Sequence, residues 1–394
     1  MKSVAIVGIG VGANTITHEA METICNAEVL AGAPRMLEIA SAIVVNMPKR
    51  QYSCYLPEDI SAIIAKENAE RFVVLVSGDV GFFSAATKLS ETLDKYNCHL
   101  IPGVSTVNAF FAKLKIPWQE AAFISAHGRI VNIASYVRRN RLTFCLTGNN
   151  TADIAMQMKS AGLGHITTYF GENLGTEQEH IFETTAGDLL QAPLTVLLFK
   201  NDIYDDRTPT GLPDDNFVRI EGVPMTKSEV RAIAMSKLNI SPHFVCYDIG
   251  AGTGSVTVEM ALSAHRGHVY AIERRKDAIP LISRNLAAFN IDNVTTVCGE
   301  APSALNSLPV PDAVFIGGSS GEIAKIIQTV LEKNLNIKIV ITAVTIETVS
   351  LAIKAFESAG MKPDITQISI ARGKRTGKLH LMEAQNPITI ISSK

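Results

Sequence analysis

One glycine-rich segment constrains the fold of this 394-residue chain more than any other. The apolar run Val245–Ile249 precedes alternating glycines at Gly250, Gly252 and Gly254, and a later apolar run ends at Glu273. This order predicts a strand, a tight turn, a helix and a second strand. Glycines let a ligand approach the backbone, a helix start offers free N–H groups, and an acid ending the second strand can bind both ribose hydroxyls. The segment therefore predicts a nucleoside-binding turn.

The glycine spacing separates two kinds of nucleotide site. A dinucleotide site needs G-x-G-x-x-G, and the position of its third glycine is Ser255 here. The pattern D-x-G-x-G-x-G instead resembles the first motif of Rossmann-like S-adenosylmethionine (SAM) methyltransferases, and Glu273 would bind the ribose. An NAD-type turn, or a turn that binds nothing, is the alternative for this stretch alone. The resemblance implies SAM contacts from Gly250, Ala251, Gly252, Thr253, Gly254 and Glu273.

Composition allows two domains and argues against several classes of protein. The chain is long for one core, and with 47% apolar and 19% charged residues it is not disordered. A net charge of −2 argues against a general nucleic-acid or membrane-surface protein, and no apolar run reaches membrane-spanning length. Six scattered cysteines, without C-x-x-C or zinc spacing, indicate buried thiols and no metal site. We expect a cytoplasmic protein, since its first residues have no signal-peptide pattern.

The first half of the chain alternates apolar runs with helical patterns. Such alternation predicts an α/β domain with a largely parallel sheet, whose ligands lie beyond the carboxyl ends of the strands. Strands are predicted at Val4–Val7, Phe72–Val76, Cys98–Ile101, Ala121–Ile124, Leu142–Leu146, His165–Phe170 and Leu194–Phe199. Helices are predicted at Ser84–Asp94, Ser105–Lys113 and Thr151–Ala161.

Three loops at strand ends carry a more specific signal: Gly8–Gly12, Ser77–Phe83 and Pro102–Thr106. With LAGAPRML (Leu30–Leu37), SAHGR and GENLGT, their order resembles that of the tetrapyrrole methylases, most closely the branch that methylates precorrin at ring carbon 5. The resemblance implies a two-lobed N-terminal tetrapyrrole methylase fold with SAM held between α/β lobes. The implied contacts are Gly8, Gly10, Ser77, Gly78, Asp79, Phe82, Ser105 and Thr106.

Each of these residues also has a structural explanation. The glycines can serve backbone turns alone, Asp79 can cap the following helix, and Ser105 can cap its own. His127 and Arg129 follow a predicted strand and are candidates for binding substrate carboxylates. A lone His–Arg pair is at least as often a structural hydrogen-bonding unit, so both interpretations stay open.

The segment Lys200–Arg219 divides the chain. Its prolines, glycine and aspartates break regular structure and bury little, so it is predicted to be a linker, with the boundary close to Pro209. The predicted domains are residues 1–205, for methylation at ring carbon 5, and 206–394, for methylation and decarboxylation at ring carbon 15. The second domain opens with the helical pattern Met225–Leu238, in which Thr226 and Glu229 form a predicted capping box.

The second half resembles decarboxylating precorrin methyltransferases that act at ring carbon 15. GEAPSAL, LPVPDAVFIGG and TAVTIET carry this resemblance, which adds Thr226 and Ala301 to the second set of SAM contacts. It implies a C-terminal Rossmann-like, seven-stranded SAM-dependent methyltransferase fold. Beyond the central segment, strands are predicted at Val294–Cys298, Ala313–Ile316 and Lys338–Thr342, a helix at Ile346–Ala359, and a final hairpin of Asp364–Ala371 with Lys378–Gln385.

Together the two resemblances imply SAM-dependent methylation of precorrin-6Y, or its cobalt form, at ring carbons 5 and 15, with loss of a ring acetate carboxylate, in cobalamin biosynthesis. They also imply two SAM sites and a homo-oligomer. Methyl transfer to an electron-rich ring carbon needs orientation more than a strong base, and the chain has no Ser-His-Asp, Cys-His or metal constellation. Lys227, Arg231 and the basic run Ala371–Lys378 are candidates for the substrate's carboxylates; for the basic run a solvated hairpin turn is favoured.

Three other functions remain open on the sequence. One is a methylase for another tetrapyrrole fused to an unrelated methyltransferase. A second is an NAD-dependent oxidoreductase with two Rossmann units, which the missing third glycine and the absence of a catalytic dyad disfavour. A third is a SAM-binding sensor without catalytic activity.

Overall fold

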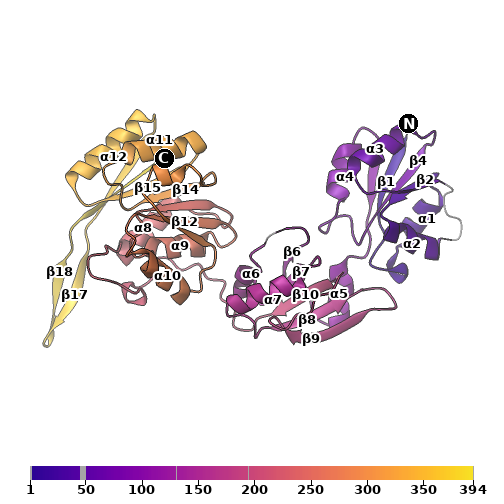
Figure 1. Cartoon of the computed structure of the whole chain (residues 1–394), viewed down its shortest axis with the longest axis horizontal. Coiled ribbons are helices and arrows are strands. Elements are labelled where there is room, and N and C mark those ends of the chain that lie inside the picture. The colour runs from indigo at the N-terminus through magenta and orange to yellow at the C-terminus, as the bar shows by residue number, and fades with distance from the viewer. Residues whose placement is uncertain (1, 45–49, 130, 194, 394) are drawn as a thin grey trace. The chain divides into compact units, whose positions relative to one another are not determined.

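A computed structural model of the chain describes residues 2–44, 50–129, 131–193 and 195–393. It divides the chain into two compact units, Met1–Asp205 (unit 1) and Asp206–Lys394 (unit 2). Helices and strands alternate in both (Figure 1), and the predicted α/β class is confirmed.

The first sheet of unit 1 is parallel throughout. Its order, over the described residues, is β3 (Arg50–Ser53), β2 (Val29–Gly32), β4 (Arg71–Val76), β1 (Ser3–Gly8) and β5 (Asn97–Ile101). Strands β1 and β4 are buried on both faces, which is why they read as continuous apolar runs. The accompanying helices are η1 (Ala13–Thr15), α1 (His18–Cys25), α2 (Pro34–Ile43), α3 (Pro57–Lys66) and α4 (Ala86–Leu93).

The second sheet of unit 1 is mostly antiparallel, so the expected largely parallel pairing is wrong for this half. Its order is β6 (Ala122–Ser125), β7 (Leu142–Leu146), β10 (Thr195–Lys200), β8 (Thr167–Glu172) and β9 (His180–Thr185). Among the described strands of this second sheet, only β6 and β7 pair in parallel. The loop between β8 and β9 is too short for a crossover helix, so these strands must run in opposite directions. Leu194, where the last predicted strand begins, lies outside the described residues.

Helices cover both faces of this second sheet. They are α5 (Thr106–Leu114), α6 (Ile133–Arg139) and α7 (Thr151–Ser160). Leu197 and Phe199 of β10 pack with the helices α6 and α7, whereas Val196 and Leu198 pack with α5. The alternation follows from the two-residue period of a strand.

Unit 2 contains, within residues 206–393, the predicted seven-stranded sheet. Its order is β13 (Val294–Cys298), β12 (His268–Glu273), β11 (Val245–Ile249), β14 (Ala313–Ile316), β15 (Lys338–Ala343), β19 (Ile388–Ser393) and β16 (Pro363–Ile368). The first five strands are parallel and β19 is antiparallel to both its neighbours. The helices are η2 (Asp214–Asn216), α8 (Ser228–Leu238), α9 (Ser255–Ser263), α10 (Ile279–Ala288), η3 (Ser303–Leu305), α11 (Ile323–Lys333) and α12 (Ile346–Ser358).

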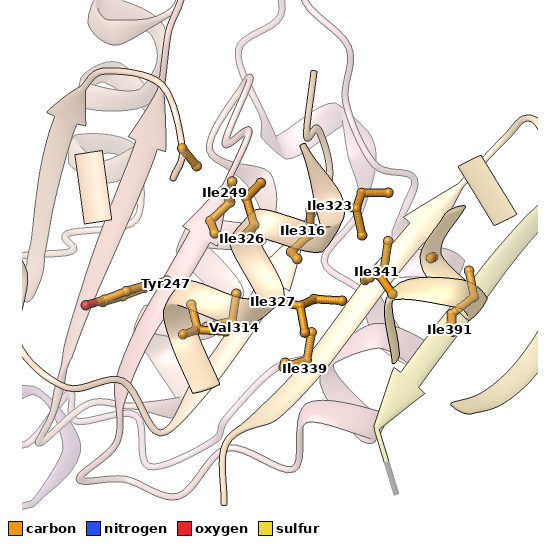
Figure 2. Close-up of a cluster of buried hydrophobic side chains, with 14 of the residues drawn as sticks. Tyr247, Ile249, Val314, Ile316, Ile323, Ile326, Ile327, Ile339, Ile341 and Ile391 are labelled. Carbon is orange, nitrogen blue, oxygen red and sulfur yellow. The ribbon is translucent and has the colours of Figure 1, made fainter. Parts of the chain in front are cut away.

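The largest core of unit 2 holds the ends of its central strands in place. Isoleucines and valines of β11, β14 and β15 meet side chains of α11 and α12 on one face of the sheet (Figure 2). Ile249 and Ile316, near the carboxyl ends of β11 and β14, are 2% and 1% exposed. Burying each such side chain contributes about 1.5–3 kcal/mol. The loops that follow these two strands therefore start from fixed positions.

The predicted final hairpin is wrong in register and in place. The structure pairs β17 (Ala371–Thr376) with β18 (Leu379–Ala384) as a separate two-stranded ribbon that extends away from the sheet (Figure 1). The sheet itself is completed by β16 and by β19. The sequence reasoning missed β19. The ribbon strands are too exposed to belong to a core, and β19 is a short run at the end of the chain.

Most of the predicted linker, from Asp206 onward, is part of unit 2. Asp214 and Phe217 are buried, 6% and 4% exposed, although the composition of the segment predicted little burial. The backbone N–H groups of Gly211 and Leu212 donate hydrogen bonds to the carboxylate of Glu259 in α9. A buried acid far along the chain thus anchors this segment, which local composition could not indicate.

Candidate functional site

In unit 2 a cavity of about 260 Å³ lies beyond the carboxyl ends of β11, β12 and β14. The strand order reverses here, because β12 pairs on one side of β11 and β14 on the other. The loops after such strands diverge and leave room for a ligand. Six predicted SAM contacts line this cavity, and their role in binding stays a prediction: Thr226, Gly250, Ala251, Gly252, Glu273 and Ala301.

The turn after β11 needs glycine at two positions. Gly250 and Gly252 have φ angles of +77° and +55°, which side chains rarely adopt. A Cβ atom on Gly250 would lie 2.6 Å from the backbone N of Gly318, and one on Gly252 would lie 2.8 Å from the backbone O of Pro224. The cavity wall is therefore bare backbone at this turn.

Glu273 ends β12 and fixes the glycine turn. Its Oε2 accepts a hydrogen bond from the backbone N–H of Gly252 at 2.9 Å, and its Oε1 accepts one from the N–H of Arg275 at 2.8 Å. The side chain lines the cavity although the residue is only 6% exposed. Each carboxylate oxygen keeps a second lone pair, so the expected ribose contact is compatible with both hydrogen bonds.

Thr253 and Gly254 lie behind the cavity rather than on its wall, so the expected direct contacts from them are not supported. Thr253 is fully buried, and its carbonyl accepts a hydrogen bond from Nδ2 of Asn285 at 2.8 Å. Gly254 is the N-cap of α9 and packs against Ile282. Both residues hold the turn against α10.

The predicted capping box before α8 is wrong. The helix begins at Ser228 with Lys227 as its N-cap, and the side chain of Lys227 makes no capping hydrogen bond; the carboxylate of Asp214 accepts one from the N–H of Ser228 at 3.0 Å instead. Glu229 instead binds Arg372 of the ribbon through two hydrogen bonds, of 2.6 and 3.0 Å. These bonds lower the pKa of Glu229 to about 2. Thr226 precedes the helix and lines the cavity, whereas the partly exposed Lys227 does not; its role in substrate binding stays a prediction.

Arg231 is not available to a substrate, which corrects its assignment as a carboxylate-binding residue. Its side chain is fully buried and forms ion pairs with Glu259 at 2.7 Å and Asp214 at 3.0 Å. It also donates hydrogen bonds to the backbone carbonyls of Thr226 and Leu212. Arg231 thereby connects the wall of the cavity to the anchored end of the linker.

Asp248, the last acid before the glycine turn, is a buried carboxyl at the base of the cavity. Its Oδ2 accepts a hydrogen bond from the hydroxyl of Thr257, and its Oδ1 has no hydrogen-bond partner among the described residues. Burial, and then the charge of Glu273, raise the pKa of Asp248 to about 7. An orphaned acceptor at the base of the cavity is compatible with a bound ligand that donates a hydrogen bond.

The raised pKa of Asp248 predicts a pH dependence of stability. Folding takes up a proton between pH 3.8, the ordinary pKa, and pH 7, so the free energy of unfolding falls as the pH rises through this window. The Asp248→Asn variant lacks this proton uptake. Urea unfolding of both proteins should give a wild-type value that falls relative to the variant by up to about 1.4 kcal/mol per pH unit. Parallel pH profiles would contradict the prediction.

Unit 1 contains a larger cavity, of about 860 Å³. It is lined from one side by the loops after β1 and β4 and by α2, and from the other by loops of the second sheet. Eight predicted binding residues line it, six expected at SAM and two at the substrate: Ser77, Gly78, Asp79, Phe82, Ser105, Thr106, His127 and Arg129.

Gly8 and Gly10 lie behind this lining and serve backbone contacts, which is the structural alternative considered for them. Gly10 and Gly78 exchange two backbone hydrogen bonds, of 2.9 and 3.1 Å. A Cβ atom on Gly8 would lie 2.7 Å from the backbone O of Gly78 and 2.8 Å from the backbone N of Gly103. The three predicted loops thus meet at glycines.

Two polar residues of these loops have structural partners as well as a place on the cavity wall. Asp79 accepts hydrogen bonds from the backbone N–H of Gly81 at 2.8 Å and of Gly103 at 3.2 Å, and so joins two of the loops. It does not cap α4, whose N-cap is Ala85. Ser105 is the N-cap of α5 and accepts a hydrogen bond from the N–H of Asn108.

His127 and Arg129 are exposed on the cavity wall, after β6. Nδ1 of His127 lies 3.4 Å from the carbonyl of Thr147. No hydrogen bond or ion pair of the Arg129 side chain occurs among the described residues. The geometry therefore leaves the arginine available to a substrate, and its role stays a prediction.

Sequence reasoning assigned no role to several other lining residues. Arg35 lies within the quoted LAGAPRML segment, and Phe83 within SGDVGFF, directly after the predicted Phe82. Thr147, Asn173 and Thr176 come from loops of the second sheet. The GENLGT segment that contains the last two was a usable signal, since it was part of the tetrapyrrole methylase resemblance.

The matches to known proteins fall into two groups, one within each unit. The model of tetrapyrrole (corrin/porphyrin) methylases matches residues 3–190, and that of the precorrin methyltransferase domain matches residues 218–394. A probable cobalt-precorrin-6B C(15)-methyltransferase (decarboxylating) from Pyrobaculum calidifontis is 43% identical over 185 residues, which are 46% of this chain and 95% of that protein. The chain belongs to the precorrin methyltransferase family. Both predicted resemblances are confirmed.

Solved structures of precorrin methyltransferases are similar to single halves of the chain. A precorrin-6Y C5,15-methyltransferase from Geobacter metallireducens is 36% identical, with a TM-score of 0.45, and the match covers 47% of this chain and 96% of that one. A precorrin-6Y methylase from Archaeoglobus fulgidus is 24% identical, with a TM-score of 0.42, covering 51% of this chain and 98% of that one.

Two kinds of feature are absent from the part of the chain that the structure describes. No described helix is both long and apolar enough to cross a membrane. No group of three or more described His, Cys, Asp or Glu side chains is arranged to hold a metal ion.

Proposed function

We propose that this precorrin methyltransferase methylates precorrin-6Y, or its cobalt form, at ring carbons 5 and 15 and decarboxylates the ring C acetate. Unit 1 carries the first methylation, and unit 2 the second methylation with the decarboxylation. Each unit has its own SAM site. The names of the relatives support this assignment. The proposed reaction is a step of cobalamin biosynthesis.

The observation that carries the proposal is the presence of two cavities with different construction in two separate units. Each lies at the carboxyl ends of strands, and most of the SAM contacts predicted for its unit line it. A methyltransferase with one SAM site, fused to an unrelated domain, would not need a second set of predicted SAM contacts. Apart from a glycine turn in each, the two sets consist of different residues, so each has to bind SAM by its own geometry.

The residues around the unit 2 cavity fit a bound SAM. The bare backbone at Gly250 and Gly252 admits a nucleoside, and the free lone pairs of Glu273 can accept the ribose hydroxyls. SAM supplies an electrophilic methyl group. About 260 Å³ is below the 300–1,000 Å³ usual for ligand cavities, so the macrocycle must bind at the open mouth.

The unit 1 cavity, of about 860 Å³, is within the 300–1,000 Å³ usual for ligand cavities. Its backbone glycine junction and the apolar side chain of Phe82 offer a wall for the cofactor, and Arg129 offers a positive charge for a carboxylate. In-line methyl transfer needs the nucleophilic ring carbon held close to the methyl group, so orientation by this wall is the main contribution of unit 1.

Decarboxylation at unit 2 requires a desolvated acetate and an electron sink. The conjugated macrocycle can accept the electron pair released when carbon dioxide leaves, so the protein has to bind and align the carboxylate. The narrow cavity beside the Glu273 carboxylate would repel that anion. We therefore place the acetate at the mouth, on the side of the basic Lys227, which precedes α8.

Mass analysis of the product tests the proposal. Incubation with precorrin-6Y and methyl-labelled SAM should add two labelled methyl groups and remove one carbon dioxide. Calorimetry with S-adenosylhomocysteine should give two molecules bound per chain. Binding of NADH would favour the oxidoreductase alternative, and binding of S-adenosylhomocysteine without turnover would favour the sensor. A cytoplasmic location and a homo-oligomer are part of the same proposal, and light scattering tests the latter.

A further inference from the structure

Arg35 is a cationic side chain that lines the unit 1 cavity. It is the second residue of α2, after Pro34, and is partly buried. Among the described residues its guanidinium makes no hydrogen bond or ion pair. Burial lowers the pKa of Arg35, because a charge removed from water is penalised unless an anion approaches it.

Stability of the fold does not explain an arginine at this position. A positive charge in the first turn of a helix opposes the helix dipole and is unfavourable. The N-cap residue of α2, Ala33, has no side-chain hydrogen bond to offset this. The arginine therefore costs stability in the ligand-free protein, and such costs are typical of binding sites.

The acidic side chains that share the cavity do not neutralise Arg35. Asp79 uses both carboxylate oxygens to bind the backbone of Gly81 and Gly103. Glu38, one turn further along α2, is exposed and forms no ion pair with Arg35 within the described residues. On the other lobe of unit 1, Arg129 also lacks a partner among them. Two unpaired arginines therefore line one cavity from different lobes.

An exposed aromatic ring lines the same cavity. Phe83 is 47% exposed, lines the cavity and has a φ angle of +47°, an unusual conformation for a bulky side chain. Strain of this kind is concentrated at functional sites. Its ring meets Phe82 edge-to-face, with centroids 4.9 Å apart. A planar apolar surface in a cavity that also contains these two guanidinium groups matches a ligand that is flat and apolar in the middle and acidic at its edge.

We propose that Arg35 binds a peripheral carboxylate of the macrocycle in unit 1 and, together with Arg129, makes this cavity selective for polycarboxylate tetrapyrroles. Phe83 provides the surface for the ring. This inference rests on the proposed function, because it assigns substrate contacts to the same cavity. It is a role in positioning and specificity, with no part in bond making.

Uroporphyrin I, a stable octacarboxylate, and its octamethyl ester serve as probes with the full-length protein. Charge-assisted hydrogen bonds predict that Arg35→Gln raises the Kd for uroporphyrin about tenfold to a hundredfold. Arg35→Lys should give a Kd between those of wild type and Arg35→Gln, because the lysine ammonium keeps the charge but lacks the planar guanidinium that binds a carboxylate with two hydrogen bonds. Binding of the ester and of S-adenosylhomocysteine, and the melting temperature, should not change. Arg71→Gln, which removes a charge from the same lobe outside the cavity, should bind uroporphyrin like wild type.

Several results would overturn the inference. The first is that the wild-type protein does not bind uroporphyrin. The second is that wild type and Arg35→Gln bind it with equal Kd. The third is that Arg35→Gln weakens the binding of uroporphyrin and of its octamethyl ester by the same factor. With precorrin-6Y, the variant should raise KM for methylation at ring carbon 5 and leave kcat within about threefold. If precorrin-6Y is not methylated but uroporphyrin binding depends on Arg35, the proposed function fails and this inference stands. An unchanged KM would sink the inference and leave the proposed function intact.

Discussion

Replacing Arg231 by methionine is expected to lower the free energy of unfolding of unit 2 by about 3–5 kcal/mol. The guanidinium is fully buried and pairs with Glu259, itself fully buried, and with Asp214. Methionine fills similar space but leaves the buried Glu259 without a positive partner among the described residues, whereas Asp214 keeps its ion pair with Arg372 at 3.1 Å. It also removes the donors to the carbonyls of Thr226 and Leu212, and unmatched acceptors add to the loss.

Lys237 on the same helix is the matched control. It pairs with Asp364 at 2.7 Å, but its side chain is 20% exposed and that of its partner 36% exposed. Lys237→Met should cost less than about 1 kcal/mol. Urea unfolding followed by circular dichroism reports both units, whereas fluorescence of the single tryptophan, Trp118, reports unit 1. A loss for Arg231→Met no larger than for Lys237→Met would contradict the prediction, and the tryptophan transition should not move.

Replacing Gly103 by alanine is expected to remove SAM binding from unit 1. The new Cβ atom would lie 2.3 Å from the backbone O of Gly78 and 2.4 Å from that of Gly8. Both neighbours are backbone atoms at the junction of the three loops, so they cannot move aside as a side chain would. The loops have to separate, at a cost of about 3 kcal/mol or more. The stoichiometry of S-adenosylhomocysteine should fall from two per chain to one.

Gly162→Ala separates this effect from the general cost of replacing glycine. Gly162 follows α7 with a φ angle of +73°, and nothing lies within 4 Å of its ideal Cβ position. The variant should lose about 1–2 kcal/mol from backbone strain and keep both bound molecules. If Gly103→Ala also keeps two, the glycine junction is not part of the cofactor site.

Buried parallel strands were the part of the fold that sequence predicts best. The predicted bounds of β11 and β14 agree with the structure to the residue, because each is a short, largely apolar run with turn residues after it. The bounds of the partly exposed edge strand β13 agree as well. The pairing direction of the second sheet in unit 1 was not predictable in this way. Whether β10 lies parallel or antiparallel to its neighbours depends on which strands meet in space, and the apolar runs look alike in both cases.

Within the candidate sites, backbone positions were predicted better than charges. The glycine turn and Glu273 lie where the motif spacing placed them, on the cavity wall. The environment of Arg231 depends on Asp214 and Glu259, which lie 17 and 28 residues away in the chain, and neither pairing has a local signature. For the same reason Glu229 could be assigned to a capping box, although Arg372 of a distant ribbon binds it.

The hydrogen bonds from Gly211 and Leu212 to Glu259 limit where the chain can be divided between two separate genes. A gene that encodes unit 2 alone must begin upstream of residue 211, even though the family match starts at residue 218. A product that began at residue 218 would lack Gly211, Leu212 and Asp214, and would keep Arg231 and Glu259 with a broken set of contacts. Fusion or fission during evolution is therefore easiest in the few exposed residues between Asp205 and Gly211, where neither core would be cut.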